Sequence, residues 1–296
     1  MQHWTSRLAI LPLLAVASVS WGAPRTFDKQ FTAPPGGKLV VDTADGSITI
    51  VGHDSRDLTV HADISGTEAY TVTAEQSDAG VTVQGRGHFR WYNVAFNYVS
   101  VHITIEVPRD YPVELKSSDG RLEISQINAG LHGKTSDGRI TLRDITGDVD
   151  MQTSDGSITA ENLKGSVRLQ TKDGSIDVNH VAGQIEARTS DGHVDLQDVD
   201  GKITVHDKDG RVTVAARSNH GIAISASDGN VTLQLPGDIQ GSITANAHGG
   251  RIRSDFPVTM TATEAPDRGY LSGQINGGGE AITIDASDGH ITLSRL

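Results

Sequence analysis

The stretch KTSDGRITLRDITGDVDMQTSDGSITAENLKGSVRLQTKDGSIDV, from Lys134 to Val178, contains Asp-Gly three times, each copy eighteen residues after the last. The period extends in both directions: the Gly of Asp-Gly recurs at 120, 138, 156, 174, 192 and 210, and then at 229. Two outlying copies, Asp45-Gly46 and Asp288-Gly289, lie near the ends of the chain, and Gly249-Gly250 resembles a degenerate copy. A fixed period of this length is typical of a solenoid in which each repeat forms one coil.

Apolar residues follow the same period. In each repeat they form two pairs, and the members of a pair are two positions apart, the spacing of residues on one face of a β-strand. The first pair of columns is Ile140, Ile158, Ile176, Val194, Val212, Val231 and Leu142, Ala160, Val178, Leu196, Val214, Leu233. The second is Val149, Val167, Ile185, Ile203, Ile222 and Met151, Leu169, Ala187, Val205, Ile224, with Ile145, Leu163, Val181 and Val199 between the pairs. We therefore predict an all-β fold, a two-sheet β-solenoid of the β-helix or β-roll kind, with about 18 residues per coil.

Both ends depart from this pattern. We expect residues 23–115 to form an N-terminal coil, a hairpin and an aromatic cap, with 39–60 as the coil. Residues 116–250 are the regular 18-residue-repeat solenoid, and residues 251–296 are a looser C-terminal coil and cap that ends in a coil at 281–295. Atypical terminal units are expected because a solenoid must close its exposed strand edges.

The first 22 residues have the features of a signal peptide. Arg7 provides the positive charge, an apolar run extends from Leu8 to Val19, and small residues surround a cleavage point after Gly22. No other segment is apolar enough to cross a bilayer, so we expect a chain that does not span the membrane after cleavage. The predicted location is the periplasm, the extracellular space or the cell surface.

Composition excludes several classes of function. The 296 residues include no cysteine, so disulfides, thiolate catalysis and cysteine metal sites are ruled out. The formal net charge is −12, from 25 basic and 37 acidic residues, which argues against nucleic acid as a partner. We predict no cofactor.

The chain resembles a family of bacterial envelope proteins described as putative adhesins, which are exported, are built on β-strand repeats and contain a domain of unknown function. The segments that carry the resemblance are FTAPPGGKLVVDTADGSITIVG, VHITIEVP with SSDGRLEISQI, the TSDGSITAENLKGSVRLQT coils and ITIDASDGHITL. Together they cover roughly residues 27–296. The resemblance implies an envelope location and a repetitive β architecture, and it brings no catalytic residues.

The aspartates of the Asp-Gly pairs are the clearest candidate for chemistry. They form a column of one carboxylate per coil: Asp119, Asp137, Asp155, Asp173, Asp191, Asp209 and Asp228. Calcium β-rolls have coils of similar length, but they require Gly-Gly-x-Gly-x-Asp in both turns of each coil. Here we interpret Asp-Gly as a tight turn in which Gly tolerates positive φ and Asp accepts backbone N–H bonds. Lys172 and Lys208 are expected to balance the charge. We predict no metal site.

The segment HFRWYNVAFNY contains five aromatic residues: Phe89, Trp91, Tyr92, Phe96 and Tyr98. Exposed aromatic clusters commonly bind sugar rings or protein partners. An equally compatible role is to cover the apolar end of the first coil.

The sequence thus predicts an exported, non-enzymatic solenoid that acts as a binding or adhesion scaffold of the cell envelope or surface. Its partner would be a protein or glycan of that envelope or surface, and we assign no catalytic residues. Two alternatives stay open. One is a polysaccharide-active β-helix enzyme, a lyase or hydrolase, although identical aspartates in every coil single out no catalytic pair. The other is a calcium-dependent β-roll.

Overall fold

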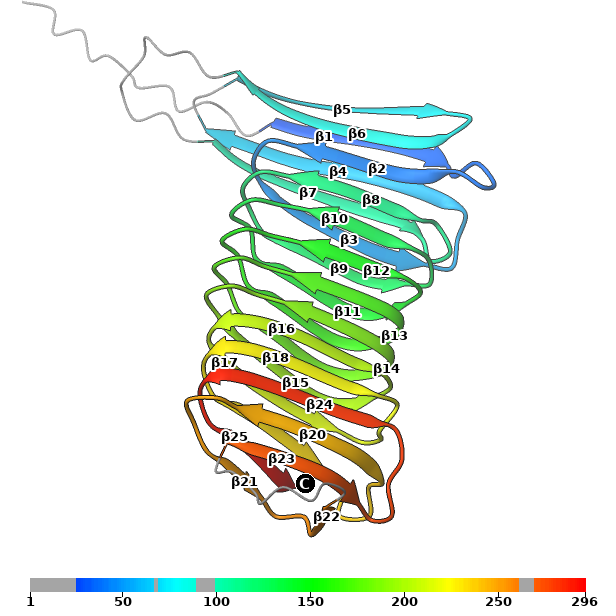
Figure 1. Cartoon of the computed structure of the whole chain (residues 1–296). Helices are drawn as coiled ribbons and strands as arrows, with labels where there is room; N and C mark the ends of the chain where they lie inside the picture. Colours follow the sequence, from blue (N-terminus) through cyan, green and yellow to red (C-terminus); the bar gives the residue numbers. More distant parts are fainter. Residues whose placement is uncertain (1–24, 67–68, 89–98, 261–268) are drawn as a thin grey trace, which may run out of the picture.

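The computed structural model describes residues 25–66, 69–88, 99–260 and 269–296. In these ranges the chain forms 25 strands and no helix. The strands stack into an elongated solenoid in which two rows of strands face each other (Figure 1). The all-β solenoid predicted from the eighteen-residue period is confirmed.

Sheet I is the row whose strands lead into the Asp-Gly corner in the regular coils. From the N-terminal end of the stack its order is β5 (Ala69–Ser77), β6 (Gly80–His88), β2 (Lys38–Thr43), β8 (Val113–Ser117), β10 (Leu131–Lys134) and β12 (Val149–Gln152), then the second halves of β13 (Ile158–Gln170) and β14 (Ile176–Arg188). It continues with β16 (Ile203–Asp209), β18 (Ile222–Asp228), β24 (Ala281–Asp288), β20 (Gly241–Ala247), β23 (Tyr270–Ile275) and β22 (Val258–Met260).

Sheet II is the opposite row. Its order is β1 (Arg25–Thr32), β4 (Asp57–Gly66), β7 (Val99–Pro108), β3 (Ser47–His53), β9 (Leu122–Ile127) and β11 (Ile140–Thr146), then the first halves of β13 and β14. It continues with β15 (His193–Asp200), β17 (Arg211–Ala216), β19 (Val231–Leu235), β25 (Ile291–Arg295) and β21 (Ile252–Ser254). Because β13 and β14 continue through the corner of their coils, the two sheets are joined there.

The core lies between the sheets and consists of the predicted columns. Every residue of the four strand columns and of the corner column is at most 3% exposed. Neighbouring coils pair in register, so that Ile140 lies between Leu122 and Ile158, and Leu142 between Ile124 and Ala160. No single coil has enough apolar surface to fold alone, and stacking makes one continuous core.

Close backbone stacking at the Asp-Gly corner sets how the coils fit together. A Cβ added to Gly156 would lie 1.9 Å from the carbonyl oxygen of Gly138, and one added to Gly174 would lie 2.0 Å from that of Gly156. The two outlying Asp-Gly pairs, at 45–46 and 288–289, stack in the same column of glycines. At the N-terminal end, the carbonyl oxygen of Gly46 would lie 1.9 Å from a Cβ on Gly120. At the other end, the oxygen of Gly229 would lie 1.8 Å from a Cβ on Gly289. Only glycine allows this approach.

The expected positive φ at Asp-Gly is wrong for the regular coils. In this column Gly46 and Gly120 have positive φ, whereas the glycines from Gly138 to Gly229 lie outside the left-handed region. Glycine is needed at this corner because the next coil passes so close.

Left-handed residues occur instead at the opposite corner, with the same period. Their φ values lie between 55° and 62°, and they are Gln126, Asp144, Asn162, His180 and Asp198. Asn, Asp and His are the side chains that tolerate this conformation best after Gly. Each of these residues is left out of the strand pairing, as Asp144 is between Arg143 and Ile145. The extra residue shifts the alternation of side chains, so Leu142 and Ile145 both face the core although they are three residues apart. We did not predict this column from the sequence.

A buried threonine ladder supports the Asp-Gly corner. Thr153 Oγ1 donates to the carbonyl oxygens of Ser136 (3.1 Å) and Gly138 (3.3 Å) in the preceding coil. Thr171 and Thr189 make the equivalent bonds one and two coils further on. The corner carbonyls thus provide acceptors for hydroxyl groups that are themselves buried.

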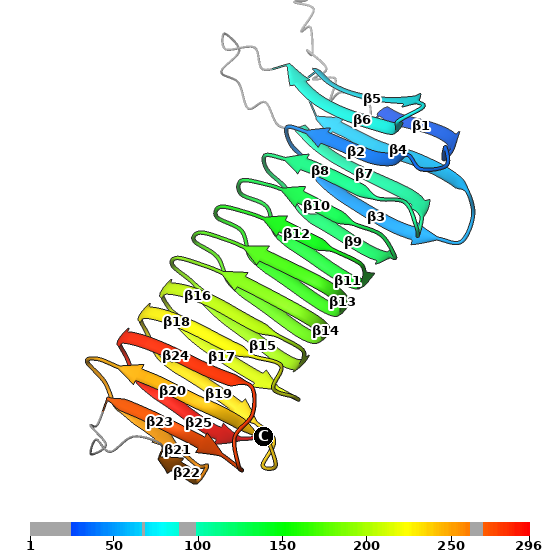
Figure 2. The ribbon, with the colours of Figure 1, turned by 45° about the vertical axis from the view of Figure 1, so that its right-hand side comes forward.

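At both ends of the stack the spatial order of coils differs from the sequence order. The β2–β3 coil lies between the β6–β7 coil and the β8–β9 coil. Likewise β24 and β25 insert between the coils β18–β19 and β20–β21, as Figures 1 and 2 show for β24. The β2–β3 coil and the β24–β25 coil are therefore each the second in the stack.

Antiparallel strands make up much of the two ends. The expectation of one coil over 39–60 is wrong in its last part, because Leu58 and Val60 belong to β4, which runs antiparallel to β7 and β1. Phe27 and Phe31 of β1 pack against the core. At the C-terminal end, β23 pairs antiparallel with β20 and β22, and the ring of Phe256 is buried.

We predict that Gly156→Ala will strongly destabilise the solenoid. Its new Cβ would overlap the Gly138 carbonyl oxygen and push two coils apart, so we expect a loss of stability on the order of 3 kcal/mol in thermal or denaturant unfolding. Gly130→Ala is the control, because its Cβ would meet only His132 Nε2 at 3.7 Å. Equal melting temperatures for the two variants would contradict the stacking argument.

Candidate functional site

The aspartates of the Asp-Gly pairs stack at one corner. Asp209 lies beside Asp228, and Asp228 beside Asp288. Hydrogen bonding with Asp209 raises the pKa of Asp228, and partial burial together with the neighbouring Asp209 raises the pKa of Asp191. The ammonium groups of Lys172 and Lys208 lie 3.8 and 3.7 Å from the carboxylates of Asp173 and Asp209. The column is therefore a row of mutually repelling carboxylates with local counter-charge.

In the part of the chain that the structure describes, no group of three or more His, Asp or Glu side chains is arranged to hold a metal ion. Calcium in proteins takes six to eight oxygen ligands, most of which must come from converging groups. The column instead holds its carboxylates in a line, one per coil.

Asp207 is an exception within the threonine ladder. It occupies the position of the ladder threonines one coil after Thr189, and it is 6% exposed. Neither carboxylate oxygen makes a well-aligned hydrogen bond, although the nearby backbone N–H of Lys208 favours the charged form. Burial raises the pKa of Asp207 from its usual 3.8 to about 6, and the charges of Asp209 and Asp191 add to the shift. A protonated carboxyl group can donate a hydrogen bond, as the threonine hydroxyls do, whereas a carboxylate cannot.

Phe89, Trp91, Tyr92, Phe96 and Tyr98 lie outside the described residues. The binding role suggested for this aromatic segment stays a prediction.

One exposed histidine joins a serine and an aspartate. Ser175 Oγ lies 2.9 Å from His193 Nδ1, and His193 Nε2 lies 3.3 Å from Asp177 Oδ1. The side chains of His193 and Asp177 are 56% and 44% exposed, so water would solvate any charge that develops there. Catalysis by such a group depends on a site that excludes water and holds donors for an oxyanion.

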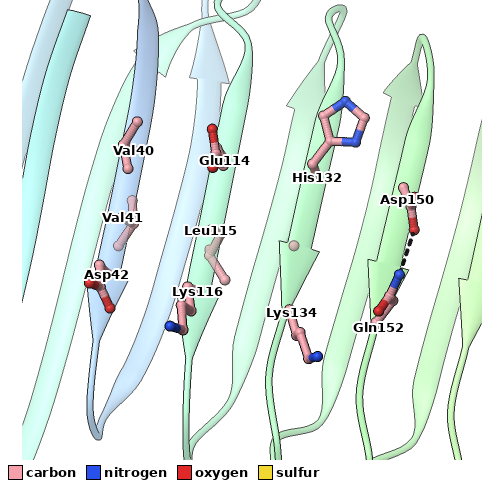
Figure 3. A pocket seen from close by; sticks show the side chains of 11 residues that line it. Val40, Val41, Asp42, Glu114, Leu115, Lys116, His132, Lys134, Asp150 and Gln152 are labelled. Carbon is pink, nitrogen blue, oxygen red and sulfur yellow. Dashed lines mark hydrogen bonds between the residues drawn. The ribbon is translucent and has the colours of Figure 1, made fainter.

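A shallow hollow of about 420 Å³ lies on the outer face of sheet I, across β2, β8, β10 and β12 (Figure 3). Its outward side chains are Val40, Asp42, Glu114, Lys116, His132, Lys134, Asp150 and Gln152. They reach the same surface because alternate residues of each strand face outward, as in the burial pattern of β8. This hollow is the candidate functional site.

Three carboxylates of the hollow are each paired with a different cation. Arg86 donates two hydrogen bonds to the Asp42 carboxylate, at 3.2 and 2.5 Å, and holds the pKa of Asp42 below its usual value. The ammonium group of Lys38 lies 2.5 Å from Glu114 Oε2. Arg168 Nη1 lies 3.6 Å from Asp150 Oδ2. Arg168 is shared, because its Nε lies 2.9 Å from Glu186 Oε2, whereas Asp42 and Glu114 are each joined to a cation at 2.5 Å. The negative charge of the hollow is therefore largely balanced at Asp42 and Glu114.

Lys116 and Lys134 form the positive part of the hollow. They are adjacent in register on β8 and β10, and both are exposed. Among the described residues, no hydrogen bond or ion pair joins either ammonium group to a carboxylate, although the nearby charge of Lys116 helps to lower the pKa of Asp42. Two like charges side by side on a sheet repel each other. The hollow can therefore attract an anion.

The two lysines begin a longer row along the solenoid axis, which we call the donor row. In register, one coil after another, it consists of Lys116, Lys134, Gln152, Gln170, Arg188 and His206. Each of these six side chains can donate a hydrogen bond. Arg188 already forms an ion pair with Glu186, and the acidic Asp42 lies next to Lys116 in the same register on β2. Alignment of the coils on their Asp-Gly pairs would have revealed this row, because its members lie three residues before each Asp, but our sequence analysis missed it.

One family model matches most of this chain, and solved structures of low sequence identity are similar to it. A family model described as Toastrack DUF4097 matches residues 37–294. A solved structure of a putative adhesin from Parabacteroides merdae has 10% identity and a TM-score of 0.53, covering 92% of this chain and 96% of that one. Another putative adhesin, from Bacteroides fragilis, has 12% identity and a TM-score of 0.41, with coverage of 92% and 97%. No curated protein matches the sequence.

Within the described ranges, no helix is long and apolar enough to cross a bilayer.

We predict that Asp207→Thr will stabilise the protein at neutral pH. In the folded chain Asp207 keeps its proton up to about pH 6, whereas in the unfolded chain an aspartate loses its proton near pH 4. The folded state therefore loses stability relative to the unfolded state as the pH rises between these two values. The full loss is about 3 kcal/mol, and it is complete above the folded pKa. Thr removes this dependence and supplies a hydroxyl donor.

The measurement is the free energy of unfolding of both proteins from pH 4 to pH 7. The difference between them should widen towards neutral pH, and Asp238→Thr, at an exposed position, should behave as the wild type does. Parallel curves for Asp207→Thr and the wild type would contradict the assignment.

We also predict that excess EGTA will leave the melting temperature unchanged. The reason is that the aspartate column lines up its carboxylates without bringing a ligand set together. A fall of many degrees on chelation, reversed by added calcium, would favour the β-roll alternative instead.

Proposed function

Because the chain belongs to the Toastrack DUF4097 family, we propose that it acts as an exported, non-enzymatic scaffold of the cell envelope or cell surface. Its outer sheet faces, including the hollow on sheet I, would bind a protein or glycan of that surface. The Parabacteroides merdae protein of similar fold is described as a putative adhesin, which agrees with this role.

The outer face of sheet I supports the binding role. Along its regular strands the outward positions are polar or charged, while the inward positions are apolar, as in the BeBeB pattern of β8 and the BiBi pattern of β12. Each strand in the middle of the stack is hydrogen bonded to neighbours on both sides, which holds the outward side chains in fixed rows. A rigid, repetitive surface suits binding of an extended partner without a large ordering cost.

Repetition also supports a non-enzymatic role. A glycosidase requires one carboxyl group with a raised pKa opposite another at a set separation. The carboxylates of the aspartate column recur in every regular coil. Among the described residues, the carboxyl group whose pKa is raised to about 6, that of Asp207, is buried beneath the corner.

Export can be tested through the first 22 residues. We expect the protein recovered from outside the cytoplasm to begin after Gly22, as measured by mass spectrometry of the intact chain. Leu13→Asp with Leu14→Asp, which interrupts the apolar run, should leave the precursor inside the cell. Wild-type protein that keeps its first 22 residues and stays in the cytoplasm would contradict export.

Binding can be tested by sedimenting the purified protein with isolated envelope fragments. We expect saturable retention that unlabelled protein competes away, because a fixed surface offers a limited number of matching sites on its partner. Retention that is absent, or that rises in proportion to concentration without competition, would count against a scaffold role. Bovine serum albumin, another acidic protein, is the control for non-specific trapping.

A further inference from the structure

We propose that the donor row on the outer face of sheet I binds the carboxylate groups of an extended acidic polysaccharide. Lys116 and Lys134 would form its principal contact. The inference rests on the proposed function, because it names the ligand class of that same surface.

Charge is the first argument. The hollow contains five ionised side chains besides His132, and its three carboxylates, on Asp42, Glu114 and Asp150, each have a cation partner from the hollow's margin. Lys116 and Lys134 remain, adjacent and without an ion pair of their own among the described residues. A carboxylate placed between the two ammonium groups would relieve their repulsion and gain two charge-assisted contacts. The local charge therefore fits an anion, although the whole chain is acidic.

The direction of the row is the second argument. Successive members lie on neighbouring strands, about 4.8 Å apart, along the long axis of the stack. A ligand that uses several members must therefore be extended and must repeat its acceptors. Gln152 and Gln170 continue the row after the lysines. The Gln152 amide donates one hydrogen bond to Asp150 Oδ1 at 3.4 Å, which leaves its second N–H, and both N–H groups of Gln170, for hydroxyl or carboxylate oxygens. A chain of acidic sugars presents both kinds of acceptor along its length.

The middle of sheet I favours a polysaccharide over a peptide. Extended peptides commonly bind by adding a strand to a free sheet edge. Here β8 is paired with β2 and β10, and β10 with β8 and β12, so neither strand has a free edge. The backbone N–H and C=O groups of β8 and β10 are paired with neighbouring strands on both sides, so a ligand on this face would contact side chains.

Polygalacturonate, a polymer of uronic acids, is the probe for the test, and neutral dextran is the comparison. We expect wild-type protein to bind polygalacturonate in biolayer interferometry, with an affinity that falls as salt is added. Lys116→Gln with Lys134→Gln should weaken binding by about tenfold, because both charged contacts are removed. Its melting temperature should not fall, since the two like charges no longer repel.

The matched control is Lys164→Gln with Lys202→Gln, which removes the same charge from exposed positions away from the donor row. This control should bind polygalacturonate within about twofold of the wild type, because long-range charge alone has a small effect in physiological salt. An equal loss in both double variants would overturn the inference. So would wild-type affinity for polygalacturonate no greater than for dextran, or for polyglutamate as great as for polygalacturonate, since the latter would indicate an acidic peptide.

Failure of this inference is separable from failure of the proposed function. If Lys116→Gln with Lys134→Gln is still retained by envelope fragments as well as the wild type is, the scaffold role stands and the donor row is not its binding surface. If that variant loses retention along with polygalacturonate binding, both are supported.

Discussion

The contact on which the rest of this structure depends is the backbone of one glycine lying against that of the next at the Asp-Gly corner. The carbonyl oxygen of Gly138 occupies the volume that a side chain on Gly156 would need, and the contact recurs from coil to coil. It brings successive coils to the distance at which parallel strands hydrogen bond. In-register pairing then aligns every other position of the repeat, including the apolar columns of the core.

Because neighbouring coils pair in register, each position of the repeat becomes a row of equivalent side chains. Some rows stabilise the stack through hydrogen bonds, and others destabilise it through repulsion between like charges. The threonine row joins neighbouring coils through hydroxyl-to-carbonyl hydrogen bonds, and the left-handed row gives the opposite corner its extra residue. Hydrogen bonds within that second row, such as the one from Asn162 to Asp144 at 3.0 Å, also link neighbouring coils. The aspartate row places like charges together, and Asp207 breaks the threonine row with a buried acid. The same rule makes the donor row a continuous surface instead of scattered side chains.

The ends of the stack show how a repeat can be closed. Because β24 lies between β18 and β20, the residues nearest the C-terminus are held by strands on both sides, and earlier residues supply the outer edge. The β2–β3 coil is held in the same way at the other end. Antiparallel strands, β1 and β4 at one end and β23 and β22 at the other, follow beyond these coils, and they interrupt the parallel register that would otherwise extend the stack.

The sequence by itself determined the repeat, the two strands per coil and the residues that fill the core. It could do so because period and side-chain alternation are local properties, and Ile145 and Leu163 are as fully buried as their spacing predicts. It also contained the donor row, in Lys116, Lys134 and the residues aligned with them. Only the tertiary structure decided which neighbours each coil has. Gly46 stacks on Gly120 and Gly289 on Gly229 through contacts between residues about sixty or seventy positions apart. Such pairings depend on the path of the chain through the ends, and no local pattern encodes that path.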